Sequence, residues 1–242
     1  MPAPEDVVFL LDVDDTLLDN DRFAVDLAAR LERDFGAAGR DRYQALYEAR
    51  RTETGYADYL GALQAFRDGD EREDRLLQMS GFLLDYPFAD RLYPHALEAI
   101  AHLRTLGTVG ILSDGDIVFQ PRKIQRAGLW DAVDGRVLVY VHKERMLDAV
   151  QRHFPARHYV MVDDKPKLLA AMKRVLGDRL TTVFVRQGHY AAAGGVVVPG
   201  PDRSIAHIGE LCGLSLAELG AVVRTDATGD SPPRMAAAPE AP

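Results

Sequence analysis

Two carboxylates, Asp12 and Asp14, come directly after the apolar run 7–11. A short, branched apolar run of this kind is typical of a strand buried on both faces of a parallel sheet. The two acids are two positions apart, so on an extended backbone their side chains point to the same side. Acids at the end of a buried strand are costly unless a bound cation, a shared proton or a chemical role compensates them. We therefore interpret this stretch as a candidate reactive site, against the alternative of an ordinary solvated loop.

Three later apolar runs also end in polar side chains. The run 108–112 precedes Ser113, the run 137–141 precedes His142 and Lys143, and the run 159–162 precedes Asp163 and Asp164. In open α/β sheets, ligands bind at the carboxyl ends of the strands, so we expect these side chains to meet at one edge. Each residue alone has an ordinary structural explanation. Their shared position at strand ends indicates a functional site more strongly than any one of them does. Asp15 we interpret as a solvated turn residue.

This set of residue types suits phosphoryl transfer through an aspartyl phosphate. A carboxylate such as Asp12 can be the nucleophile, and Asp14 can protonate the leaving oxygen and then take a proton from the attacking water. Mg²⁺ prefers hard oxygen ligands, which Asp12 with Asp163 or Asp164 would supply.

The phosphoryl group itself needs partners for its oxygens. The hydroxyl of Ser113 and the ammonium of Lys143 would hold these oxygens and offset the charge that develops on them. The partner that this chemistry implies is a small phosphorylated molecule.

The elements that must position these residues alternate along most of the chain. We expect strands at 7–11, 108–112, 137–141, 159–162 and 181–185, and a short sixth element at 204–207. Helical spacing predicts helices at 94–106, 119–127, 144–154 and 166–176, and a capping-box pattern begins a last helix at Ser215. Strands that alternate with helices predict an α/β fold with a parallel sheet covered on both faces.

Residues 20–87 show only helical spacing. Apolar side chains at 23, 27, 31 and 35 predict a first helix, which Gly36 to Gly39 would end, and three more helices follow around 43–47, 56–66 and 76–83. The sequence therefore predicts an all-helical insert over 20–87, between segments 1–19 and 88–225 that form the sheet. Residues 226–242 are rich in Pro, Ala and Gly and predict a disordered tail.

Composition restricts the remaining possibilities. The formal net charge of -8 disfavours non-specific nucleic-acid binding. The single cysteine, Cys212, permits no internal disulfide and fits a reducing cytoplasm. We see neither a signal peptide nor an apolar run approaching the roughly 20 residues that span a bilayer, and so expect a cytoplasmic protein without a membrane segment. The oligomeric state stays open.

In order and spacing, the four polar strand ends resemble the motifs of the haloacid dehalogenase superfamily, in its phosphatase branch. The stretch 12–17 is similar to the first motif, Ser113 to the second, Lys143 to the third, and the pair Asp163 and Asp164 to the fourth. The resemblance covers roughly residues 6–219. It implies a Rossmann-like core with the first strand central, and a helical cap, formed by the insert, that closes over the site.

The resemblance also implies roles for the residues. Asp12 would be the nucleophile and Asp14 the acid/base, with Mg²⁺ on Asp12, the backbone carbonyl of Asp14 and Asp163. Because the fourth motif is a compact pair, it stays open whether Asp164 binds the metal directly or through water.

The third motif departs from its commonest form. Glu144 rather than proline follows Lys143, and Lys123 therefore remains an alternative phosphate ligand.

The sequence thus predicts a Mg²⁺-dependent phosphohydrolase of a small phosphorylated metabolite. A phosphomutase or phosphotransferase shares the aspartyl-phosphate step and stays possible. A 2-haloacid dehalogenase on the same fold does not need the second acid, Asp14. A phospho-accepting signalling module would have a shorter core and lack the large insert. The substrate stays open, because in this superfamily the cap determines it and the fold does not.

Overall fold

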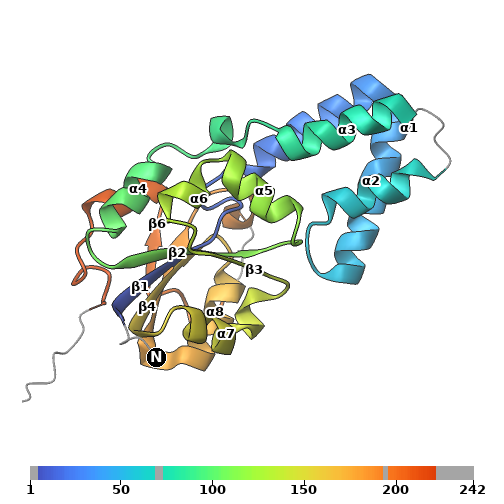
Figure 1. The fold of residues 1–242 in the computed structure, drawn as a ribbon. Helices are drawn as coiled ribbons and strands as arrows, with labels where there is room; N and C mark the ends of the chain where they lie inside the picture. The colour runs from blue at the N-terminus through green and yellow to red at the C-terminus, as the bar shows by residue number, and fades with distance from the viewer. Residues whose placement is uncertain (1–4, 69–72, 193–195, 222–242) are drawn as a thin grey trace, which may run out of the picture.

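A six-stranded parallel sheet forms the centre of the computed structural model, which describes residues 5–68, 73–192 and 196–221 (Figure 1). The strands are β1 (Glu5–Leu11), β2 (Thr108–Asp114), β3 (Val137–Tyr140), β4 (Ala156–Asp163), β5 (Leu180–Val185) and β6 (Arg203–Ile205). Their order is β3-β2-β1-β4-β5-β6, and all neighbours pair in parallel. The predicted parallel α/β sheet with the first strand central is therefore confirmed.

The apolar run of β1 explains its central place. Its five residues from Val7 to Leu11 are each at most 2% exposed. Val7, Phe9 and Leu11 pack into one hydrophobic cluster, whereas Val8 and Leu10 pack into another on the opposite face. Alternate side chains of a strand point to opposite faces, so a run that is apolar at every position must be covered on both.

Helices provide that cover. On the face of Val7 lie α4 (Ala96–Leu103), α5 (Phe119–Arg126) and α6 (Leu129–Ala132), and on the face of Val8 lie α7 (Leu147–His153) and α8 (Pro166–Leu176). We call the sheet with these helices the sheet core. Short 3-10 turns complete it: η2 (Lys143–Arg145), η3 (Gly177–Arg179), η4 (His189–Ala192) and η5 (Ile208–Gly213).

Three predicted helices differ in extent from those observed. The helix predicted at 94–106 begins only at Ala96, because His95 has a left-handed backbone with a φ of 66°, and it ends at Leu103. The helix at 144–154 is divided into η2 and α7. The capping box at Ser215 forms, with Glu218 N–H donating to Ser215 Oγ over 3.3 Å, but residues 216–220 make turns.

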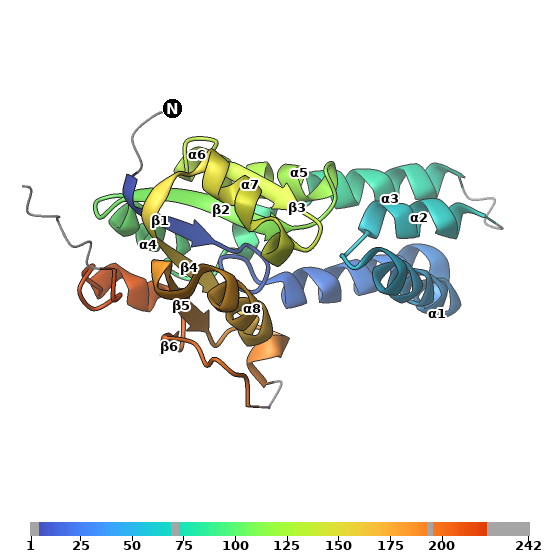
Figure 2. The same ribbon diagram turned by 90° about the horizontal axis from the view of Figure 1, so that it is seen from below.

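The predicted helical insert contains α1 (Asn20–Thr54), α2 (Tyr59–Arg67) and α3 (Glu73–Asp85). Gly36 breaks α1 with a φ of 77° and a ψ of 173°, whereas residues 37–39 are helical, so the predicted second helix continues α1 after a kink. A positive φ of this kind favours glycine. In both Figure 1 and Figure 2 the insert extends away from the end of the sheet to which β1 runs.

The two chain segments that connect the insert to the sheet core lie side by side. Asp19 N–H donates to Arg91 O over 2.8 Å, and Tyr93 N–H donates to Leu17 O over 2.9 Å. Arg91 ends the 3-10 turn η1 (Phe88–Arg91), through which the chain returns from the insert. The insert therefore joins the core through one paired connection beside Asp12 and Asp14.

Two sequence expectations lie at the limits of what the structure describes. The predicted disordered tail, 226–242, falls outside the described residues. Within the described part of the chain, the helices are each too short or too polar to cross a bilayer.

Candidate active site

Pairing of β1 with β4 brings three carboxylates together. Asp12 follows β1, its N–H donates to Val162 O over 3.0 Å, and Asp163 and Asp164 lie at the end of β4. One carboxylate oxygen from each acid lies within 4.8 Å of the others. All three side chains are buried. Three of the four residues that the sequence assigned to metal binding, all except Asp14, thus share one site, which we call the acid cluster.

Lys143 lies inside the acid cluster. Its Nζ is 2.6 Å from Asp12 Oδ1 and 2.7 Å from Asp163 Oδ2, and it donates to Leu112 O over 3.0 Å. Burial lowers the pKa of Lys143, but the charges of Asp12 and Asp163 outweigh burial and raise the pKa above its ordinary value. The lysine is therefore a fixed positive charge beside Asp12.

Asp114, to which the sequence assigned no chemistry, holds the loop that carries this lysine. Its Oδ1 accepts a hydrogen bond of 2.7 Å from the backbone N–H of Lys143. Because β2 and β3 are neighbours, the end of one strand fixes the residues after the other.

Asp14 and Ser113 are joined by Gln120. Gln120 Nε2 donates to Ser113 Oγ over 2.9 Å and to Asp14 Oδ2 over 3.2 Å. Lys123 Nζ donates to Asp14 Oδ1 over 2.7 Å, so the lysine predicted as an alternative phosphate ligand contacts the second acid instead. Gln120 was missed by sequence reasoning, although it lies one helical turn before Lys123 on the same face of α5.

Lys165 is a second cation that the sequence did not single out. Burial lowers its pKa, but the charges of Asp12, Asp163, Asp164 and Asp14 outweigh burial and raise it above the ordinary lysine value. Its Nζ lies 5.4 Å from the ring centroid of Tyr190. Two lysines thus offset the charge of the acid cluster.

The acid cluster still contains carboxylate oxygens without partners. Asp12 Oδ2 and both side-chain oxygens of Asp164 are buried and accept no hydrogen bond from the described residues. Burial, with the charges of Asp163 and Asp12, raises the pKa of Asp164 to about 9. Buried polar atoms normally have partners, and unpaired carboxylate oxygens are the ligands that Mg²⁺ takes. The donor set therefore fits a divalent cation.

Asp15 is buried, so its interpretation as a solvated turn residue is wrong. Its Oδ1 accepts hydrogen bonds from the N–H groups of Asn20 (3.0 Å) and Asp21 (3.2 Å) at the start of α1. Burial, with the charges of Asp21 and Asp14, raises the pKa of Asp15 to about 6. His189 Nδ1 lies 3.4 Å from Asp15 Oδ2 and 2.6 Å from Asp21 Oδ1.

A pocket of about 860 Å³ opens beside Asp14. The sheet core lines it with Lys165 and Tyr190, among others, and the insert lines it with Arg51 and Tyr56. Arg51 Nη2 donates to the hydroxyl oxygen of Tyr190 over 2.6 Å. The insert and the sheet core therefore form opposite walls of one pocket and touch across it.

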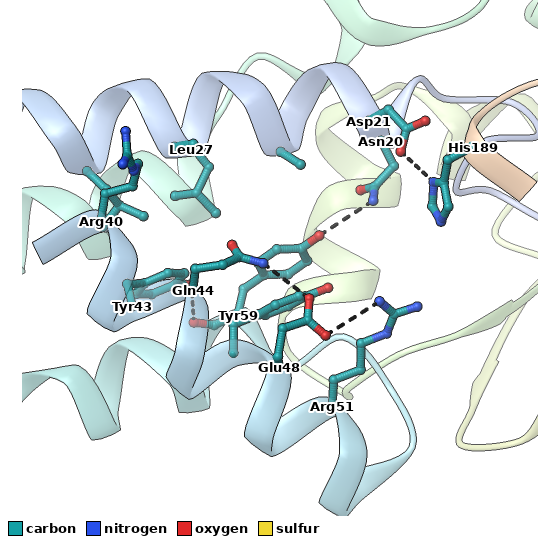
Figure 3. A pocket seen from close by; sticks show the side chains of 14 residues that line it. Asn20, Asp21, Leu27, Arg40, Tyr43, Gln44, Glu48, Arg51, Tyr59 and His189 are labelled. Carbon is teal, nitrogen blue, oxygen red and sulfur yellow. Dashed lines mark hydrogen bonds and ion pairs between the residues drawn. The ribbon is translucent and has the colours of Figure 1, made fainter. Parts of the chain in front are cut away.

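A smaller cavity of about 160 Å³ lies within the insert, between the two halves of α1 (Figure 3). Leu27 lines it from the first half of α1, and Tyr43 and Gln44 line it from the second half. It shares wall residues with the larger pocket, namely Asn20, Tyr47, Arg51 and His189. The pocket beside Asp14 thus continues toward the interior of the insert.

Comparison with known proteins shows which family and which solved structures the chain resembles. The family model of the haloacid dehalogenase-like hydrolases matches residues 7–175. No curated protein matches the chain. A crystal structure from Burkholderia xenovorans, described as a haloacid dehalogenase-like hydrolase, is 58% identical with a TM-score of 0.82, and the match covers 88% of this chain and 100% of that one.

More distant structures share the fold. The L-2-haloacid dehalogenase of Xanthobacter autotrophicus is 18% identical, with a TM-score of 0.56 and coverage of 85% of this chain and 96% of that one. The hydrolase YfnB of Bacillus subtilis, whose structure contains magnesium, is 19% identical, with a TM-score of 0.58 and the same coverages.

Proposed function

The chain belongs to the haloacid dehalogenase-like hydrolases, and on that basis we propose that it is a Mg²⁺-dependent phosphohydrolase of a small phosphorylated metabolite. The observation that carries the proposal is the place of Asp14. This second carboxylate follows Asp12 by two residues, lines the pocket of about 860 Å³, and has both oxygens hydrogen-bonded, by Lys123 and Gln120. Hydrolysis of an aspartyl phosphate needs a proton donor and acceptor beside the nucleophile.

The residues divide the reaction into two steps. A carboxylate oxygen of Asp12 attacks phosphorus, the bond from phosphorus to the leaving oxygen breaks, and Asp14 gives that oxygen a proton. Asp14 then takes a proton from water, which attacks the phosphorus of phospho-Asp12 and releases inorganic phosphate. Ser113 and Lys143 hold the phosphoryl oxygens in both steps.

Asp12, Asp163, Asp164 and the backbone carbonyl of Asp14 would hold the Mg²⁺. When bound, the ion would offset the repulsion between the carboxylates and the phosphate ester. The buried carboxylate oxygens without hydrogen-bond partners support this assignment.

The helical insert would act as the cap of the site. It forms one wall of the pocket and contacts the opposite wall through Arg51 and Tyr190. A wall that closes over the substrate excludes water and makes contacts that select the leaving group.

Turnover of an aryl phosphate tests the proposal. The Asp12→Asn variant should lose all release of inorganic phosphate in the presence of Mg²⁺. Asp6→Asn, at the exposed start of β1, is the matched control and should keep wild-type activity. A fully active Asp12→Asn enzyme would refute the assignment. A screen over sugar phosphates, nucleotides and phospho-acids, with and without Mg²⁺, would then give the substrate, and inorganic phosphate as product would separate hydrolysis from phosphoryl transfer.

A 2-haloacid dehalogenase is the second candidate, and the position of Lys143 favours it. The ammonium lies between Asp12 and Asp163 and compensates the nucleophile with a protein charge. Such a site would attack an uncharged carbon without a divalent ion. Halide release from a 2-haloacid in the presence of a chelator, with no turnover of any phosphate ester, would establish this reaction in place of phosphate hydrolysis.

A further inference from the structure

Lys123 joins the second acid of the site to the helical insert. Its Nζ donates to Asp14 Oδ1 over 2.7 Å and to Asn20 Oδ1 over 3.0 Å, and Asn20 is the first residue of α1. The lysine side chain is fully buried. We propose that Lys123 is a positioning residue, which holds the Asp14 carboxyl toward the leaving group only while the insert is packed against the sheet core. This inference rests on the proposed phosphohydrolase function.

Four aromatic rings enclose the ammonium of Lys123. Their centroids lie 5.3 to 5.8 Å from Nζ, and the rings belong to Phe23, Tyr59, Phe88 and Phe119. Rings at this distance attract a cation through their quadrupoles. They also pack on one another, with Phe23 and Tyr59 at 5.3 Å and Tyr59 and Phe119 at 5.0 Å between centroids. We call these four side chains the aromatic box.

The aromatic box is assembled from both parts of the molecule. Phe23 lies on α1 and Tyr59 on α2, whereas Phe119 lies on α5 of the sheet core. Figure 3 shows the amide of Asn20 directed toward the hydroxyl of Tyr59, to which its Nδ2 donates over 3.5 Å. The insert thus supplies two walls of the box and one of the two hydrogen-bond acceptors of the ammonium.

This division makes the contact between Lys123 and Asp14 depend on the position of the insert. A buried ammonium is tolerated only when charges and hydrogen bonds compensate it. When the insert moves away, Asn20, Phe23 and Tyr59 move with it, and water replaces them around Nζ. The ion pair of 2.7 Å then becomes solvent-exposed and weak. Because this contact differs between the packed and the displaced insert, it couples the position of the insert to the position of the Asp14 carboxyl.

Gln120 fixes the second oxygen of the carboxyl. It donates to Asp14 Oδ2 over 3.2 Å and lies one turn from Lys123 on α5. Oδ1 and Oδ2 are therefore held by separate donors of one helix. Loss of the lysine leaves the carboxyl free to rotate about the remaining bond, so Asp14 no longer faces the leaving oxygen.

Leaving-group dependence tests the inference. The substrates are 4-nitrophenyl phosphate, whose leaving group departs without a proton, and a simple alkyl phosphate, whose alkoxide needs one. Lys123→Met keeps the length and apolar stem of the side chain and removes the charge. We expect it to lower kcat for the alkyl ester at least about tenfold more than for the aryl ester, with KM changed less than about threefold, as for loss of a positioned acid. The control, Lys173→Met on α8, should leave the ratio unchanged.

A second pair of variants tests the link to the insert. Phe23→Leu removes one ring of the aromatic box, and Tyr59→Phe removes only the hydroxyl that Asn20 contacts. Both should lower the alkyl-to-aryl ratio of kcat in the same direction as Lys123→Met, with folding checked by circular dichroism. Because Tyr59→Phe keeps the ring, it provides a readout even where Lys123→Met does not fold.

The outcomes separate the inference from the proposed function. A wild-type enzyme that hydrolyses both esters, an inactive Asp12→Asn enzyme and an unchanged alkyl-to-aryl ratio in Lys123→Met and Tyr59→Phe would overturn the inference alone. An equal loss on both esters would do the same, because it indicates a general structural effect. A wild-type enzyme inactive on every phosphate ester would overturn the proposed function and the inference with it.

Discussion

Arg51 and Tyr190 are joined by a hydrogen bond of 2.6 Å between residues 139 positions apart in the chain. The arginine lies at the end of α1 in the helical insert, and the tyrosine lies in η4 of the sheet core. Both line the larger pocket, so the bond joins its two walls. It is therefore a direct contact that favours the packed position of the insert.

Removal of the tyrosine hydroxyl should weaken substrate binding. A hydrogen bond of this kind contributes about 0.5–1.5 kcal/mol net, so Tyr190→Phe should raise KM roughly two- to tenfold and leave kcat nearly unchanged. Tyr56→Phe is the matched control, because Tyr56 lines the same pocket and no hydrogen bond joins its hydroxyl to another described residue. Steady-state kinetics on one phosphate ester would measure KM and kcat for the wild type and both variants. An unchanged KM with a lowered kcat would argue against this role.

Lys143→Met should abolish activity and destabilise the fold. Asp12 and Asp163 would be left buried side by side without the ammonium that lies 2.6 and 2.7 Å from them. Removal of one partner of a buried ion pair costs about 3–5 kcal/mol, which urea denaturation would measure. Lys167→Met, at an exposed position on the pocket rim, is the control. Mg²⁺ should restore part of the lost stability, because it supplies positive charge to the same acids.

Mg²⁺ binding should release a proton. Burial and the charges of Asp163 and Asp12 raise the pKa of Asp164 to about 9, so its carboxyl is protonated at pH 7.5 in the metal-free protein. A metal ligand must be deprotonated, and apparent affinity should therefore rise with pH up to about 9. Calorimetric titration at pH 7.5 in two buffers of different ionisation enthalpy should show about one proton released per ion. Binding enthalpies that do not depend on the buffer would contradict this expectation.

Asp15 should make the free energy of unfolding depend on pH. Its pKa is raised to about 6 in the folded protein from 3.8, so between these values the folded state holds a proton that the unfolded chain has lost. The contribution of Asp15 to the free energy of unfolding therefore decreases as pH rises from about 4 to 6. A shift of one pKa unit corresponds to about 1.36 kcal/mol, so the total decrease is about 3 kcal/mol. Asp15→Asn keeps an acceptor for the N–H groups of Asn20 and Asp21.

Urea denaturation of wild type and Asp15→Asn at pH 4 and pH 7 provides the measurement. The variant should gain stability relative to wild type between the two values, and titrating groups that do not interact with Asp15 cancel in the difference. A constant difference between the two proteins would show that the carboxyl of Asp15 titrates normally.

Gly188→Ala should disturb the loop that carries His189. Gly188 has a φ of 66°, and a methyl group there would lie 2.4 Å from Asp15 Cβ. The strained backbone and the clash should destabilise the protein by about 1–3 kcal/mol and lower activity. Gly213→Ala is the control, because a methyl group at Gly213 meets no atom within 4 Å. Equal melting temperatures of the two variants would refute the packing argument.

The sequence predicts the sheet and the strand-end residues because both follow from local patterns. An apolar run such as 7–11 must be buried on both faces, and parallel strands place their carboxyl ends at one edge. These two facts bring Asp12 and Asp163 together, whereas the place of Lys143 also depends on the hydrogen bond from its N–H to Asp114. The left-handed backbone of His95, which shortens α4, has no such local signal.

The contacts of Lys123 and the burial of Asp15 could not be predicted in the same way. Lys123 lies in a polar stretch, 120–126, where lysine is usually solvated, and its burial depends on Phe23 and Tyr59 from distant helices. Asp15 is buried because η4, more than 170 positions later, packs its His189 against it. Such side-chain environments depend on how far-apart segments pack, which periodicity does not encode.

The composition of the aromatic box has a consequence for the order in which the protein matures. Its rings come from residues 23, 59, 88 and 119, so closing it brings together segments separated by up to about a hundred residues, which is slow and entropically costly during folding. An intermediate with a finished sheet and an undocked insert would have a hydrated Lys123 and a loosely held Asp14. A chain in that state should therefore lack competence for chemistry until the insert docks and the rings exclude solvent from the ammonium of Lys123.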